Sequence, residues 1–174
     1  LLDPIDFNAS ARQAIAWTRN QLEQEHLEWL RGLPLTVQLP DCEVAHGSFE
    51  DPAEFNYTLD IESAAPSFEL IRRVGFVGHS HIPLIVVQPM GAGGKLAVCM
   101  EDSLLLDDIH KALVNVGSVG QPRDEDPRCA VGFYDSDAQR IEILRIEYDI
   151  QKEIARIRQA GLPSVLADRL RLGL

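Results

Sequence analysis

Three histidines lie where the sequence predicts β-strands to end. A Gly-His-Ser-His motif at residues 78–81 places His79 and His81 after a short apolar run, and His46 follows a second strand-like run. A neutral imidazole is a good ligand for divalent ions such as zinc, manganese and iron. An extended backbone would put His79 and His81 on one face, whereas a tight turn would direct them toward two neighbouring ions. The pattern predicts a metal site, and a mononuclear structural site on the three histidines is one form of it.

Two further residues come after or within the apolar run at 113–116 and are candidates for substrate binding. Arg123 lies in a long polar loop, where its planar guanidinium could donate two hydrogen bonds to a phosphate. The same side chain could instead pair with Asp124 or Asp126. Asn115 either contacts the site or satisfies a turn, and the sequence leaves both alternatives open.

These residues need a sheet to hold them, and the apolar spacing predicts one. Strand-like alternation or short apolar runs alternate with segments of helical spacing, and the chain has more strands, more often adjacent, than a parallel βαβ array contains. The predicted strands are 35–39, 42–45, 74–78, 84–88, 95–99, 113–116, 130–134 and 140–146, and the predicted helical segments are 10–30, 66–73 with Pro66 in its first turn, and two in the tail, opened by Asp149 and Pro163. This order indicates an α/β protein with a mixed or two-sheet arrangement, in a single domain over residues 1–174.

The composition limits the class of protein. With 174 residues, 45% hydrophobic and 25% charged, the chain resembles a globular domain. No apolar run approaches the roughly 20 residues that span a bilayer, so we expect no membrane partner. A net charge of −11 argues against binding to a nucleic-acid backbone. Cys42, Cys99 and Cys129 are widely spaced, which is typical of reduced thiols and favours a cytoplasmic location.

Three segments together resemble the calcineurin-like metallophosphoesterases, particularly their small bacterial members. They are Val-Ala-His-Gly-Ser at 44–48, Val-Gly-His-Ser-His-Ile-Pro at 77–83, and Leu-Val-Asn-Val-Gly-Ser-Val-Gly-Gln-Pro-Arg at 113–123. One departure is Val116, where these bacterial proteins usually have proline. The resemblance extends over nearly the whole chain.

The resemblance implies a two-sheet αββα sandwich with a dinuclear metal centre. His46 and His79 would bind one metal and His81 the other, with manganese, iron, zinc or nickel as the ions. The family's remaining ligands lie in Asp-x-His, Gly-Asp and Gly-Asn-His-Asp/Glu motifs N-terminal to the matched stretch, and none of the three precedes residue 44 in this sequence. We therefore expect residues 1–174 to be the larger, C-terminal part of the domain, with the N-terminal strands outside this chain and no catalytic residue assignable within it.

The implied activity is hydrolysis of a small phosphate ester. A phosphomonoesterase or phosphodiesterase of this family would use a hydroxide activated by two divalent ions. The alternative is a catalytically inactive phosphoesterase-like module that binds other proteins. The three histidines favour the enzyme, because an interaction module has no physical need for them, and the residues favour no particular oligomeric state.

Overall fold

The computed structural model describes residues 7–174, which form two compact units. The larger unit contains residues 35–148 together with Gly173, and the smaller contains residues 7–34, 149–172 and Leu174. Residues 1–6, which begin the domain expected over 1–174, lie outside the described residues. The two units are described separately.

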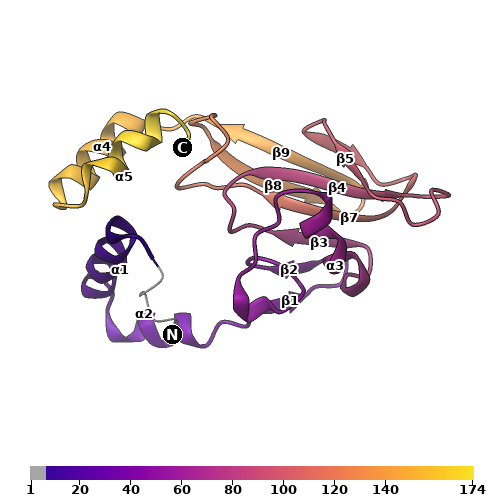
Figure 1. Ribbon diagram of the computed structural model, residues 1–174, viewed down its shortest axis with the longest axis horizontal. Helices are drawn as coiled ribbons and strands as arrows, with labels where there is room; N and C mark the ends of the chain where they lie inside the picture. The colour runs from indigo at the N-terminus through magenta and orange to yellow at the C-terminus, as the bar shows by residue number, and fades with distance from the viewer. Residues whose placement is uncertain (1–6) are drawn as a thin grey trace. The chain divides into compact units, whose positions relative to one another are not determined.

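Two β-sheets form the larger unit (Figure 1). The six-stranded sheet has the spatial order β1-β2-β3-β7-β4-β5 and consists of β1 (Thr36–Gln38), β2 (Glu43–Ala45), β3 (Val74–Val77), β7 (Ile109–Val116), β4 (Pro83–Pro89) and β5 (Ala97–Cys99). The three-stranded sheet has the order β6-β9-β8 and consists of β6 (Ser103–Leu105), β9 (Arg140–Ile146) and β8 (Cys129–Asp135). In the larger sheet β2, β3 and β7 run parallel, and β1 and β4 run antiparallel to them. The carboxyl ends of the three parallel strands therefore meet at one edge.

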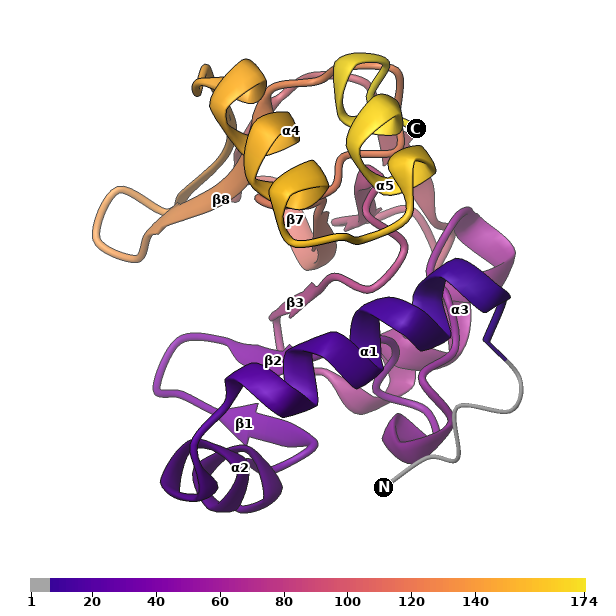
Figure 2. The same ribbon diagram turned by 90° about the vertical axis from the view of Figure 1, so that its left-hand side faces the viewer.

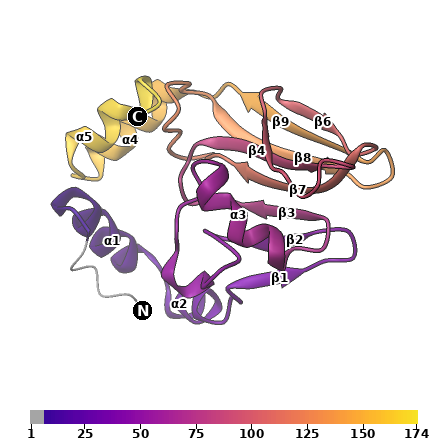
Figure 3. The same ribbon diagram turned by 45° about the vertical axis from the view of Figure 1, so that its right-hand side comes forward.

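A hydrophobic core joins the two sheets. Val74, Ile85 and Val114 of the six-stranded sheet pack with Ile141 and Ile143 of the three-stranded sheet, and all five are buried. A second core, on the other face of the larger sheet, includes Ala64 and Phe68 of helix α3 (Ile61–Leu70), which is labelled in Figure 3. Two packed sheets with helical cover confirm the predicted fold class.

Some predicted boundaries were wrong. The helix predicted from Pro66 begins instead at Ile61, because the Asp60 carboxylate accepts a hydrogen bond from Ser63 N at 2.8 Å while Ser63 Oγ accepts one from Asp60 N at 3.1 Å. Pro66 consequently lies inside the helix and not in its first turn. Strand β7 begins at Ile109, four residues earlier than predicted, and the three-residue strand β6 was missed because it is too short to show a period.

The smaller unit is helical. Its helices are α1 (Ala9–Gln21), α2 (Gln24–Arg31), α4 (Ile150–Gln159) and α5 (Ser164–Asp168). Helices α4 and α5 lie side by side (Figure 2) around a small core of Ile154, Ala167 and Leu170, and Asp149 caps α4 as predicted. Neither α1 nor α2 has a buried residue. Among the described helices, none combines the length and the apolar character required to cross a bilayer.

Candidate metal centre

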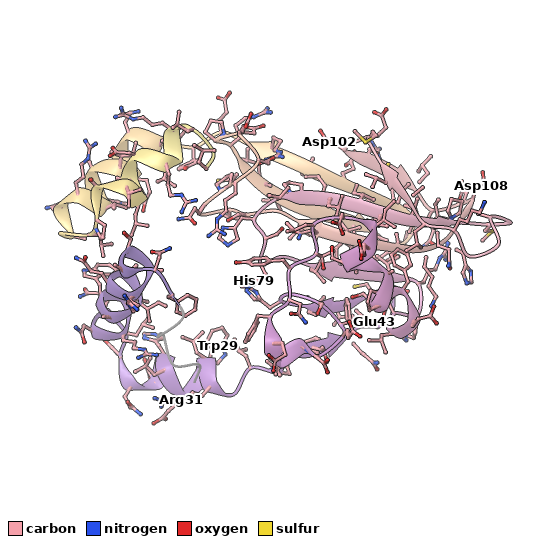
Figure 4. The ribbon with its side chains drawn as sticks, in the orientation of Figure 1. Trp29, Arg31, Glu43, His79, Asp102 and Asp108 are labelled. Atoms are coloured by element: carbon pink, nitrogen blue, oxygen red, sulfur yellow. The ribbon has the colours of Figure 1, made fainter. Side chains whose placement is uncertain are left out.

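Two of the histidines face each other at the carboxyl edge of the larger sheet. His46 directly follows β2, and His79, labelled in Figure 4, lies two residues beyond β3. Gly78 N donates to His46 O at 2.9 Å, which continues the pairing of these parallel strands beyond their ends. His46 Nε2 and His79 Nδ1 are 3.0 Å apart.

That spacing fits a shared metal ion. Two imidazole nitrogens bound to one ion at about 2.0–2.1 Å, with bonds between perpendicular and tetrahedral, lie about 2.8–3.4 Å from each other. Without an ion, one ring nitrogen carries a hydrogen and donates to the other, whose lone pair accepts it. The pair therefore has the nitrogen separation that a divalent ion requires of two adjacent ligands.

The surroundings of His79 favour its neutral form. Partial burial lowers the pKa of this imidazole, and the nearby His46, His81 and Arg123 lower it further because a second positive charge is disfavoured there. A neutral imidazole is the form that binds metal. The site thus keeps His79 competent for ligation at a lower pH than an exposed histidine.

His81 is oriented by the loop that follows β7. Its Nδ1 lies 2.8 Å from Gln121 O, and since a carbonyl only accepts, Nδ1 carries the hydrogen and the lone pair of the neutral ring is on Nε2. Gln121 Oε1 accepts from Arg123 Nε at 3.2 Å and Arg123 Nη2 at 2.8 Å, and Arg123 N donates to His81 O at 3.1 Å. Gln121 therefore fixes both the tautomer of His81 and the guanidinium of Arg123.

Asn115 lies behind the histidine turn and is completely buried. Its Nδ2 donates to Gly78 O at 2.9 Å and to Ser80 Oγ at 2.7 Å, and its Oδ1 accepts from Gly117 N at 3.1 Å. Both ends of the amide are thus occupied by protein groups. Of the two roles left open by the sequence, this geometry favours the structural one.

Imidazoles alone do not complete a two-ion centre. Two ions about 3.5–4 Å apart need bridging oxygen ligands. Within residues 7–174, the one set of three potential ligand side chains whose ligand atoms all lie within 4.8 Å of one another is Glu23, Glu25 and His26. All three are exposed at the start of α2, as surface acidic groups commonly are. The histidine edge therefore fits the nitrogen ligands of a metal centre, and its oxygen ligands are not supplied by a neighbouring carboxylate of the described chain.

The structure brings the predicted residues together at one edge. His46, His79, His81 and Arg123 are linked by the contacts given above, and Asn115 supports the turn that carries two of them. The sequence analysis missed Gln121 as an orienting residue, although it lies in the quoted run at 113–123. No spacing could have revealed it, because its partner His81 is forty residues away.

Three comparisons relate the chain to known proteins. It is 35% identical over 173 residues to an uncharacterised protein of Methanocaldococcus jannaschii, MJ0912, covering 96% of this chain and 68% of that protein. A crystal structure of a metallophosphoesterase from Sphaerobacter thermophilus matches all of this chain and 71% of its own, with 36% identity and a TM-score of 0.83. A hypothetical protein from Pyrococcus horikoshii, PH1004, shares the fold at 19% identity and a TM-score of 0.72, over 99% of this chain and 64% of its own. A scan against protein-family models found none that matches the chain.

Two packed sheets with histidines at the ends of adjacent parallel strands make this an α/β protein with a candidate metal centre at a sheet edge. The identity and coverage of the relatives make the class specific: this chain belongs to the metallophosphoesterase family.

Proposed function

We propose that the protein is a metal-dependent phosphoesterase that hydrolyses phosphomonoesters or phosphodiesters. The observation that carries the proposal is the 3.0 Å separation of His46 Nε2 and His79 Nδ1 at the ends of two adjacent parallel strands. Family membership supports it, since the Sphaerobacter thermophilus relative is described as a metallophosphoesterase. Divalent ions such as manganese, iron, zinc or nickel, when bound there, would polarise a phosphoryl oxygen and lower the pKa of a water molecule.

The residues of this chain have distinct roles in the proposed site. His46 and His79 would hold one ion, and His81, whose Nδ1 is fixed on Gln121, would present Nε2 to the other. Arg123 is the proposed anion-binding group. Its bonds to Gln121 use two of the five guanidinium N–H groups, which leaves donors for a phosphoryl oxygen.

We infer that the oxygen ligands come from the part of the family's length that this chain does not cover. The chain spans about two thirds of its relatives, 68% of the Methanocaldococcus protein and 71% of the Sphaerobacter structure. Carboxylate oxygens from that remainder would bridge the ions and neutralise their charge.

The test uses the full-length gene product, stripped of metal and then supplied with manganese, with nitrophenyl phosphate and bis(nitrophenyl) phosphate as substrates. We expect manganese to restore hydrolysis of at least one substrate. His46→Ala and His79→Ala should each lower kcat/KM by at least about 100-fold, because loss of even an outer partner of a metal ligand costs about 10–100-fold. Both variants should also retain less bound metal by elemental analysis.

His110→Ala is the matched control, since His110 is exposed on β7 and belongs to no set of clustered ligand side chains among the described residues. It should leave activity and metal content unchanged. The test is repeated with iron, zinc and nickel. If the wild-type protein hydrolyses neither substrate with any of these four metals, and its metal content does not depend on His46, the proposal is wrong and the inactive interaction module is the better interpretation.

A further inference from the structure

Aromatic side chains line the imidazole pair on one side. The Tyr57 ring stacks on the His79 ring, with centroids 4.4 Å apart and planes inclined by 12°. The Phe55 ring lies 5.7 Å from His46 in an edge-on arrangement and 6.0 Å from His79. Both aromatic residues belong to the segment between β2 and α3, so the chain that leaves one histidine returns to pack against the pair.

This segment is held at two points. Gly47 lies so close to it that a Cβ atom there would be 2.8 Å from Asn56 O, which a larger residue would not tolerate. Farther along, Thr58 is buried and its carbonyl accepts from Asn115 Nδ2 at 3.3 Å. Tyr57 is therefore positioned by backbone contacts on both sides, and its stacking does not depend on a freely moving loop.

Tyr57 nevertheless remains widely exposed. Although His79 covers one face of the ring, 47% of the residue is accessible. Leu59 in the same segment and Ile61 at the start of α3 are also exposed, at 51% and 38%. Tyr57 thus presents an accessible aromatic surface directly beside the histidine pair. A phosphate group alone has no use for such a surface, whereas the organic part of a phosphate ester does.

We propose that Tyr57 determines specificity by stacking on a planar aromatic group of the ester, so that the favoured substrates carry an aryl group or a nucleobase. The inference rests on the proposed function, because it places the phosphate of the same ester beside the histidines and Arg123. Offset stacking is favourable for any flat π-system, and aromatic side chains commonly bind bases in this way. A saturated ring of similar size gains only the free energy of burying its apolar surface.

The test compares two phosphonates that cannot be hydrolysed, phenylphosphonate and cyclohexylphosphonate, by calorimetric titration of the metal-loaded full-length protein. The wild type should bind the phenyl compound about tenfold more tightly, which corresponds to a stacking contribution within the range measured for bases on aromatic residues. Tyr57→Phe should keep this preference and Tyr57→Ala should abolish it. Phe133→Ala, which removes another exposed aromatic ring on β8, is the matched control and should change neither affinity.

A second pair of probes, the non-hydrolysable methylenephosphonate analogues of adenosine monophosphate and of ribose 5-phosphate, separates the two sources of the ring. A preference for the nucleotide that Tyr57→Ala removes assigns a nucleobase, and a preference confined to phenylphosphonate assigns an aryl group. The inference is wrong if the wild type binds the two members of each pair equally well. It is also wrong if Tyr57→Ala weakens binding of both members of each pair by the same factor, or if no probe binds. Hydrolysis by the wild type is measured separately, so a failed specificity does not conceal an active enzyme.

Discussion

The turn that carries His79 and His81 is conformationally unusual. Both residues have left-handed backbone angles, with φ of 64° and 66°, which non-glycine residues adopt at a cost. Ser80 N donates to Gly78 O at 2.7 Å within the turn, and the buried Asn115 amide bonds the same carbonyl and Ser80 Oγ. These hydrogen bonds therefore hold the turn in a conformation that directs the His79 imidazole to His46 and the His81 imidazole to Gln121.

Asn115→Ala should destabilise the protein and loosen this turn. The substitution leaves buried acceptors without their donor, which costs about 1–3 kcal/mol. Urea unfolding of the wild type, Asn115→Ala, Ser80→Ala and the double variant gives the coupling energy of the pair. We expect a coupling of about 1 kcal/mol and reduced metal retention in Asn115→Ala. Strictly additive losses with unchanged metal content would contradict a role for Asn115 in positioning the histidines.

At the level of single residues, the sequence predicted candidate ligands but not the residues that contact them. The histidines could be predicted because strand-end imidazoles form a recognisable pattern. Tyr57 and Gln121 could not, because their contacts with His79 and His81 arise only when β2, β3 and β7 assemble. Ring stacking and hydrogen bonds to a backbone carbonyl produce no regular residue spacing that could be recognised in the sequence.

At the level of elements, the site depends on a loop as well as on strands. The segment after β7 returns to His81 through the Arg123 backbone, and ion pairs anchor it farther along. Asp124 pairs with Arg145 of β9, and Asp126 pairs with Arg128 of the same loop at 2.6 Å and with Arg145 at 3.9 Å. The polar loop predicted from the sequence is thus fixed by its charges to the second sheet.

Asp126→Asn should reveal this anchoring through pH. Hydrogen bonds from Arg128, aided by the charges of Arg128 and Arg145, lower the pKa of Asp126 from 3.8 to about 2. Because the pKa is lower in the folded state, the carboxylate contributes stability that is fully present above pH 3.8 and is lost as the pH falls through about 2. Wild type should therefore unfold at higher urea than Asp126→Asn at pH 7, with the difference shrinking toward pH 2. Glu125→Gln, an exposed neighbour, is the control. A difference that is constant across this range would exclude an ionic origin.

At the level of the whole molecule, the alternation of strands and helices predicted an α/β protein with a mixed or two-sheet arrangement, because buried strands keep an apolar period. The family resemblance, and not the alternation, implied the two packed sheets that the structure has. The division into two compact units could not be predicted in this way. It depends on which apolar faces become buried, and the sequence shows apolar residues on α1 and α2 that the structure leaves exposed, including Trp29 at 65% and Leu30 at 45%.

This difference in burial predicts unequal local stability. Helices α1 and α2 bury no residue, whereas β7 buries Ile109 and the four consecutive residues 112–115 between the two cores. Amides open individually where few apolar contacts hold an element and exchange only by larger unfolding where many do. In hydrogen exchange followed by mass spectrometry, amides of α1 and α2 should exchange at least about 1,000-fold faster than those of β7, a difference of about 4 kcal/mol.

Helix α3, which buries Ala64, Ser67 and Phe68, is the internal control for helical structure and should be protected nearly as well as β7. Protection of α1 and α2 equal to that of α3 would show that these helices are covered in the full-length protein, and would identify their exposed tryptophan and leucine side chains as a packing surface.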